Sequence, residues 1–322
     1  MFSRCNATAC LLTAALGAMP LAAAASDFPT RRIDLVVPFG AGGSSDVYGR
    51  LFAQKSQELL GQPMVVLNRS GAGGAIGLIS VAKAAADGYT IALAGTNLAM
   101  GKAVNPAIGY DPVKDFVPVA NLITQAVFVA VNASSRITSI GQYIEEARKN
   151  PGKLNYGSSG IGGSTHFAGE FFKMITGAQI INVPIREGAV VTLLGGHVDS
   201  IFVNTPDIVS HVRNGKIRAL ATTTLARVPQ IPDVPTVAES GFPNFNVVSW
   251  IGITAPAGTP AAVVDRLAAY FEQVSKDPKV RDTLGEMGAS VTFMAPRDFS
   301  QWVQSETRRW TQVANELNIR AQ

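Results

Sequence analysis

Two glycine-rich segments of this sequence place hydroxyl side chains where they could bind an anion. Residues 40–46 read Gly-Ala-Gly-Gly-Ser-Ser-Asp and residues 160–166 read Gly-Ile-Gly-Gly-Ser-Thr-His, so both fit the pattern G-x-G-G-S-[S/T]-[D/H]. Glycine lets the backbone turn tightly and approach a ligand, and Ser or Thr at the start of a helix lies beside unpaired N–H groups. Because a helix N-terminus carries partial positive charge, each segment favours an anion, and a planar carboxylate suits it.

The same residues have a simpler explanation. Glycine and serine also connect strands to capped helices without binding anything, and residues 71–77 form another glycine-rich segment. Two matching segments in separate halves of the chain favour the binding role. One helix N-terminus from each half would hold a dicarboxylate at both ends, or one carboxylate from both sides. His166, in the second segment, would either donate to the bound carboxylate or only cap its helix.

The sequence lacks the common enzyme motifs. A dinucleotide-binding loop needs a third glycine, but the three glycine-rich segments have Ser45, Ile76 and Thr165 at that position. There is no G-x-x-x-x-G-K-[S/T] and no G-x-S-x-G, and the three histidines are not spaced as metal ligands. We therefore expect no catalytic residue, no cofactor and no metal. The alternative is a secreted hydrolase or lyase, whose candidate residues would be Ser44, Asp46, Ser164 and His166.

Composition excludes several classes of protein. The chain has 322 residues, of which 47% are hydrophobic and 16% charged, which rules out disorder, collagen and coiled coil. The length fits two domains or one large one. The net charge of +4 is small and its residues are dispersed, whereas a nucleic-acid surface would concentrate basic residues on one face. We expect no nucleic-acid partner.

The first 26 residues have the layout of a secretory signal peptide. They carry one charge at Arg4, then an apolar stretch over residues 9–21, then small residues with Ala23-x-Ala25 as the expected cleavage site. The apolar stretch is shorter than the roughly 20 residues that span a membrane. Both cysteines lie inside this segment, so the mature chain would have no thiol and no disulfide. We expect an exported, periplasmic protein.

The remaining chain alternates β-branched runs with stretches of helical period. The expected strands are residues 33–37, 64–67, 90–94, 125–131, 153–156, 180–183 and 217–223. The expected helices are residues 45–60, 76–86, 139–149, 164–176, 260–275, 278–284 and 296–317. Such alternation predicts an α/β fold with a largely parallel sheet, which binds ligands beyond the carboxyl ends of its strands. Both Gly-Ser segments lie in loops of that kind.

Many short motifs follow one another in an order typical of one family. They include Val37-Pro38-Phe39-Gly40-Ala41-Gly42-Gly43, Asn68-Arg69, Ala85-Ala86-Asp87-Gly88-Tyr89-Thr90, Tyr110-Asp111-Pro112-Val113-Lys114-Asp115-Phe116, Gly162-Gly163-Ser164-Thr165-His166, Pro232-Asp233-Val234-Pro235-Thr236 and Ala255-Pro256-Ala257-Gly258-Thr259-Pro260. Through these motifs the whole mature chain resembles the periplasmic substrate-binding proteins of tripartite tricarboxylate transporters, the Bug family.

The resemblance implies a two-lobed periplasmic binding protein of type II, a Venus flytrap with a cleft between its lobes. The chain would cross between lobes near Thr124 and Ser249. Residues 27–124 plus 249–322 would form lobe 1, and residues 125–248 would form lobe 2. The implied function is a monomeric receptor that delivers a small organic acid to the membrane permease subunits of the transporter. A sensor subunit that feeds a signalling partner is the alternative.

In this family two strand-to-helix loops, one per lobe, grip a carboxylate through amides, hydroxyls and ordered waters. The resemblance maps these loops onto residues 39–46 and 158–166. The expected ligand-binding residues are Phe39, Gly40, Ala41, Gly42, Gly43, Ser44, Ser45, Asp46, Thr96, Ser158, Ser159, Gly160, Gly163, Ser164, Thr165, His166, Arg186 and Asn204.

Two departures from the family pattern concern the part of the site that selects the ligand. Ile185-Arg186-Glu187-Gly188 replaces an aromatic residue, a basic residue and glycines. After Phe202 many relatives carry an acid, but here Val203-Asn204 follows. Without that acid an ammonium group loses a partner, which favours a non-amino carboxylate; Glu187 would reverse this preference.

Overall fold

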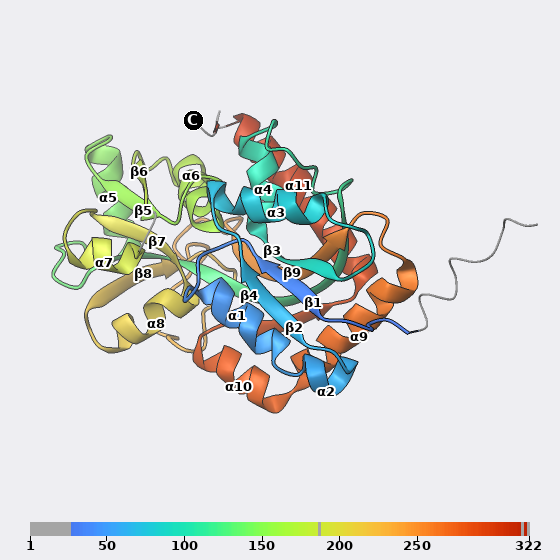
Figure 1. The fold of residues 1–322 in the computed structure, drawn as a ribbon. Coiled ribbons are helices and arrows are strands. Elements are labelled where there is room, and N and C mark those ends of the chain that lie inside the picture. Colours follow the sequence, from blue (N-terminus) through green and yellow to red (C-terminus); the bar gives the residue numbers. More distant parts are fainter. Residues whose placement is uncertain (1–26, 186–187, 317–318, 321–322) are drawn as a thin grey trace, which may run out of the picture.

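The computed structural model describes residues 27–185, 188–316 and 319–320. The expected signal peptide, residues 1–26, lies outside the described residues, as do Arg186 and Glu187. Figure 1 shows two α/β regions side by side, one containing β1, β2 and β3 and the other β5, β6 and β7. None of the helices within the described ranges is long and apolar enough to cross a membrane.

The first region is a parallel three-stranded unit. Its strands are β1 (Ile33–Val37), β2 (Met64–Asn68) and β3 (Thr90–Gly95), and β1 pairs in parallel with both neighbours. Its helices are α1 (Ser44–Ala53), α2 (Ser56–Leu60), the short 3-10 helix η2 (Ala72–Gly74), α3 (Ala75–Ala82) and α4 (Thr96–Val104). β1 is an almost continuous buried apolar run, as expected for a parallel strand covered on both faces. The predicted helix over 45–60 is divided by a turn at Gln54 and Lys55.

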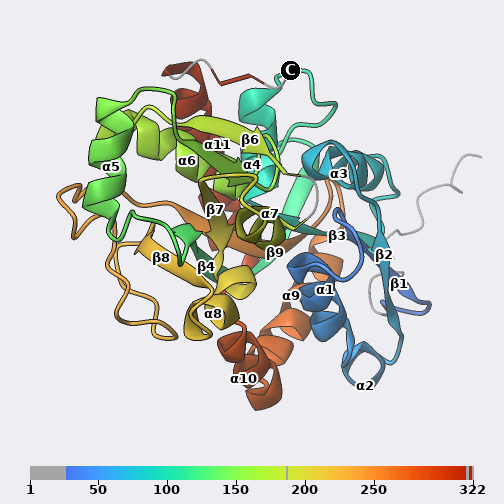
Figure 2. The same ribbon diagram turned by 90° about the vertical axis from the view of Figure 1, so that its left-hand side faces the viewer.

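The second region repeats this arrangement. Its parallel strands are β5 (Asn155–Ser158), β6 (Ile181–Pro184) and β7 (Ser200–Asn204), with β5 between the other two. Its helices are α5 (Ile140–Lys149), α6 (Ser164–Thr176), α7 (Ala189–Leu194) and α8 (Thr205–Arg213). α6 begins at Ser164, within the second Gly-Ser segment, as predicted. Figure 2 shows α6, α7 and α8 on one side of the molecule and α1 and α3 on the other.

Long antiparallel strands join the two units. β4 (Phe116–Asn132) pairs with β9 (Val248–Pro256) through residues 116–126 and with β10 (Ser290–Met294) near Thr124. From Val127 onward β4 pairs instead with β7 and with β8 (Ile217–Thr222). β9 also pairs antiparallel with β3.

The prediction of a mostly parallel sheet therefore needs correction. Among the described strands five of the nine pairings are antiparallel. The α/β alternation does predict the strands of the first parallel unit, and in the second unit it predicts β5 and β6 but not β7. It fails for β4 and β9, because a buried apolar run looks the same whichever direction its partner takes.

The C-terminal helices complete the fold and connect the two regions. They are α9 (Ala261–Lys276), α10 (Pro278–Glu286) and α11 (Pro296–Glu316). Near its start α11 packs Phe299 against Trp250 of β9. Near its end Trp310 lies 5.1 Å from the ring of Phe167 on α6 and joins the core of the second region. A single helix thus contributes to the cores of both regions.

Candidate functional site

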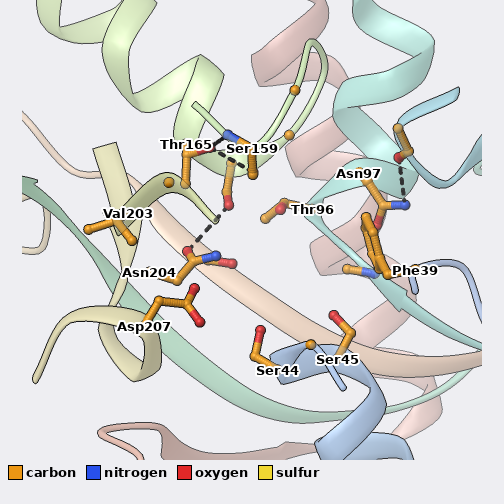
Figure 3. Close-up of a pocket in the computed structure, with 18 of the residues that line it drawn as sticks. Phe39, Ser44, Ser45, Thr96, Asn97, Ser159, Thr165, Val203, Asn204 and Asp207 are labelled. Carbon is orange, nitrogen blue, oxygen red and sulfur yellow. Dashed lines mark hydrogen bonds between the residues drawn. The ribbon is translucent and has the colours of Figure 1, made fainter. Parts of the chain in front are cut away.

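Both Gly-Ser loops face one cavity of about 650 Å³ between the two regions. Loops that follow parallel strands meet at the carboxyl edge of a sheet, so each parallel unit directs its helix N-termini toward this space. α1, α4, α6 and α8 all begin at the cavity wall, and Figure 3 shows Ser44, Thr96, Thr165 and Asn204 around it. The first N–H groups of each helix have no partner within the helix, so they remain available to an anion.

The capping residues differ from the prediction. Gly43 and Gly163 occupy the N-cap positions of α1 and α6, without a side-chain cap. Ser44 and Ser164 are therefore the first helical residues, and both line the cavity. Ser164 Oγ lies 3.5 Å from Asn204 Oδ1. Their hydroxyls add two donors at the positive ends of two helices.

Asp46 fixes the first loop from behind. Its carboxylate accepts hydrogen bonds from Gly42 N at 2.9 Å, Arg50 Nε at 3.0 Å and Asn68 Nδ2 at 3.0 Å. The hydrogen bond from Arg50 is the main reason that the pKa of Asp46 falls to about 2. Gly42 has a φ of +82°, which a residue with a side chain rarely adopts. Asp46 thus remains ionised and holds this turn in place.

The second loop is fixed by Thr165 and His166. Thr165 Oγ1 accepts from Ser159 N at 2.9 Å, and His166 Nδ1 accepts from Gly162 N at 3.3 Å. Burial lowers the pKa of His166, so its imidazole is neutral and its Nδ1 is free to accept. The sequence left two roles open for His166, donor to a bound carboxylate or cap of its helix. The contact with Gly162 corresponds to the capping role.

Polar side chains from the central strands form another part of the wall. Tyr48 Oη donates to Gln125 Oε1 at 3.0 Å, and Gln125 Nε2 lies 3.5 Å from Ser249 Oγ. Gln125 and Ser249 line the cavity from β4 and β9. Asn97, in the first turn of α4, accepts from Gly95 N at 3.1 Å and also lines the cavity.

Comparison with known proteins identifies the family. The sequence profile described as "Tripartite tricarboxylate transporter family receptor" matches residues 49–319. The chain is 35% identical to "Protein BugT" of Bordetella pertussis over 92% of each chain. It belongs to this receptor family.

Solved structures agree with this assignment. The receptor is 36% identical to the Rhodopseudomonas palustris protein Rpa4515, solved with adipate, with a TM-score of 0.85 over 91% of this chain and 99% of the other. It is 32% identical to MatC of Rhodopseudomonas palustris, solved with bound malate, with a TM-score of 0.82 over 89% and 99% of the two chains. The fold is therefore that of a two-lobed periplasmic binding protein, as the sequence predicts.

Most of the predicted site residues lie together in the receptor. The cavity is lined by Phe39, Gly40, Ala41, Gly43, Ser44, Ser45, Thr96, Ser159, Gly160, Gly163, Ser164, Thr165 and Asn204. Four predicted residues do not line it: Gly42, Asp46, Ser158 and His166. Three of these four hold the loops through the contacts given above, and Ser158 donates to Asn182 Oδ1 at 2.8 Å. Arg186 lies outside the described residues. Ligand contact by the lining residues stays a prediction.

Sequence reasoning missed several lining residues, above all Asn97, Gln125, Asp207 and Ser249. Gln125 and Ser249 could have been found, because they are polar residues inside apolar runs next to the expected crossings. Asp207 gave no such signal, because an acid in the first turn of a helix is common.

Only one charged side chain is present in the described lining of the receptor's cavity. Its described lining contains no Lys, Arg or His, and Asp207 is the one acid among those residues. Within the ranges that the structure describes, no group of three His, Cys, Asp or Glu residues is placed to hold a metal ion. Among the described lining residues, the groups that favour an anion are therefore helix N-termini and amides, not basic side chains.

Proposed function

We propose that this receptor binds a small carboxylate-bearing metabolite in the cavity between its lobes and delivers it to the membrane subunits of a tripartite tricarboxylate transporter. The observation that carries the proposal is the convergence of α1 and α6, each opened by the same Gly-Ser pattern, on one cavity. The relatives solved with adipate and with malate are consistent with it.

We place the division between the lobes where β4 changes partners. Residues 27–124 plus 249–322 form lobe 1 and residues 125–248 form lobe 2 in this proposal. It is supported by the pairing of β4, which turns from β9 to β7 and β8 between Ala126 and Val127. The C-terminal half of α11 is the exception, because Trp310 packs in the core of lobe 2.

Delivery requires the ligand to favour one arrangement of the lobes. A ligand that touches both loops at once binds best when the lobes approach each other, so it shifts the population toward that closed form. Two β strands and α11 connect the lobes and would bend in such a hinge motion. The closed form would then present a surface that the permease subunits bind.

The proposal also includes that the protein is not an enzyme. A serine nucleophile needs a base within hydrogen-bond distance. No histidine lines the described cavity wall, and Nδ1 of the nearby His166 already accepts from Gly162. Neither Ser44 nor Ser164 has a base among its described hydrogen-bond partners. We further infer a monomer that reaches the periplasm through cleavage of residues 1–26.

Thermal denaturation with candidate ligands tests the proposal. The protein is unfolded and refolded to remove any carried ligand, and is then heated with mono-, di- and tricarboxylates, keto acids and amino acids. At 100 times its Kd a ligand stabilises the fold by about 2.7 kcal/mol, which raises Tm. Each binder is recovered unchanged after incubation if the protein is a receptor. Failure of every carboxylate to raise Tm, or formation of a product, would contradict the proposal.

A further inference from the structure

Asp207 is the one acid in the described lining of the cavity. It lies in the first turn of α8, and Figure 3 shows its carboxylate directed into the space between Asn204 and Ser44. Its side chain reaches the water of the cavity. The rest of the described lining consists of neutral side chains and backbone.

An acid at this position often caps its own helix through hydrogen bonds, but Asp207 has no such bond among the described residues. A stabilising acid accepts hydrogen bonds from the first N–H groups, and its pKa falls. In the part of the chain that the structure describes, no hydrogen bond or ion pair to the Asp207 carboxylate is formed. Its pKa is instead raised to about 6 by desolvation from the surrounding protein. The Asp207 carboxylate is thus exposed to the cavity without a protein partner among the described residues, so a ligand can pair with it.

The charge of Asp207 limits what that partner can be. At neutral pH the carboxylate is mostly ionised, and in a described lining that is otherwise neutral it attracts a cationic group of a ligand and repels an anionic one. The nearest titratable neighbour, Tyr48 on α1, already donates its hydroxyl to Gln125. A second carboxylate of the ligand would face a like charge here, with no basic side chain in the described lining to offset it.

We propose that Asp207 binds the ammonium group of the ligand, so that the receptor selects an amino acid whose carboxylate is held by the two Gly-Ser loops. This inference rests on the proposed function and adds the substrate class to it. The sequence led us to expect a non-amino carboxylate instead, because no acid stands immediately after Phe202. The acid stands five residues beyond Phe202, where α8 returns it to the same cavity.

Three sets of matched ligands test the role of Asp207 by calorimetry at pH 7.5 on refolded protein. Each set keeps one carbon skeleton and carries an amino group, a hydroxyl group or neither: alanine, lactate and propionate; aspartate, malate and succinate; phenylalanine, phenyllactate and phenylpropionate. In the set that fits the cavity, we expect the amino member to bind at least tenfold more tightly than the other two. Asp207→Asn should remove that preference.

Two controls separate a ligand contact from a structural effect. Asp298→Asn changes an exposed acid in the first turn of α11, away from the cavity, and should leave every affinity unchanged. Asp207→Asn should leave the Tm of the ligand-free protein unchanged or raise it, because it removes an unpartnered acid. A Tm that falls by several degrees would show that Asp207 supports the fold and would overturn the proposal.

The remaining outcomes are distinct. Preference for a hydroxyl member or for succinate, whether or not Asp207→Asn alters it, overturns the role of Asp207 and leaves the carboxylate receptor intact. Absence of binding by all nine compounds and by the wider carboxylate panel contradicts the receptor function itself. An amino preference that persists in Asp207→Asn also overturns the assignment, because another group would then bind the ammonium.

Discussion

The two Gly-Ser loops have one sequence pattern and one task, but different chemistry holds them in place. In lobe 1 the N–H of Gly42 donates to the ionised carboxylate of Asp46, whereas in lobe 2 the N–H of Gly162 donates to the neutral imidazole of His166. The residue four positions further on also differs. Arg50 pairs with Asp46, but Glu170 follows His166 and accepts from Tyr156 Oη at 2.9 Å.

This difference separates the residues that shape the site from those that can touch a ligand. The last position of the pattern needs only an acceptor for the N–H of the third position, and either a carboxylate or an imidazole can supply it. Asp46 and His166 are the most reactive residue types in the loops, but in the structure they hold the loops and do not line the cavity; ligand contact by them stays an untested prediction. Hydroxyl and amide groups remain for the cavity itself.

The largest expected effect comes from replacing His166, the acceptor in the second loop, with aspartate, the residue type that is the acceptor in the first loop. His166→Asp would place a carboxylate in a buried position near Glu170 and near Lys173, and Lys173 already pairs with Glu170. An unpaired buried charge is strongly destabilising, so we expect the free energy of unfolding to fall by about 3 kcal/mol. Urea denaturation measures it. His166→Asn, which keeps a neutral acceptor, is the matched variant and should lose less; equal stability of both variants would show that the two loops are interchangeable.

Removing the acceptor of the first loop should have a somewhat smaller effect. Asp46→Ala leaves Gly42 N, Arg50 and Asn68 without their shared partner, and we expect a loss of about 2 kcal/mol in the free energy of unfolding. Asp46→Asn keeps one acceptor oxygen and should lie between the variant and the wild type. If Asp46→Ala unfolds at the wild-type urea concentration, then the loop does not depend on this carboxylate.

The cavity-facing hydroxyls should behave in the opposite way. Ser44→Ala and Ser164→Ala should each weaken carboxylate binding about tenfold, because one charge-assisted hydrogen bond is lost, while stability stays unchanged. Calorimetric titration with the tightest ligand of the carboxylate panel measures the affinity. Thr165→Ser preserves the hydroxyl that accepts from Ser159 and serves as the control. Wild-type affinity in both alanine variants would mean that these serines only open their helices.

Lowering the pH should affect the two loops differently, and the expected change in the free energy of unfolding is smaller than in the variants above. The pKa of His166 is lowered in the fold, so the unfolded chain binds a proton more readily, and stability falls as pH drops below the ordinary histidine value of about 6.5. Asp46 has a lowered pKa of about 2, so its contribution is full above pH 4 and disappears only as pH falls toward 2. Asp207 has a raised pKa and acts in the opposite direction, because its protonation between pH 6 and 4 favours the fold.

The wild type is therefore compared with His166→Asn in urea at pH 7.5 and pH 5. The wild type should lose more stability than the variant, because only the wild type carries the imidazole whose pKa the fold lowers. The change common to both proteins cancels in this difference, including that of Asp207. An equal loss in both would mean that the imidazole does not titrate differently in the fold.

The local sequence pattern was sufficient to predict those strands and helices whose signals lie within their own residues and the residues next to them. The strands at residues 33–37 and 90–94 and the helix at 164–176 each have a glycine or proline next to an end, and the structure confirms them. The repeat of the Gly-Ser pattern also predicted correctly that both loops face one cavity. In each case the information lies within a few neighbouring residues.

Other features depend on distant partners and could not be predicted. β7 and β9 were missed because their short apolar runs gain a place in the sheet only beside β4. Asn97 reaches the cavity only because the N-terminus of α4 lies at its wall. Asp207 was missed because its position on α8 aims it inward, which the sequence alone does not reveal.

The central claim is that the two loops together hold the carboxylate of one ligand. A crystal structure of the receptor with the tightest binder of the carboxylate panel tests it most directly. We predict carboxylate oxygens within about 3 Å of backbone N–H or hydroxyl groups in the first turns of both α1 and α6, directly or through one ordered water. A ligand whose carboxylate contacts neither loop, or lies outside this cavity, would contradict the account.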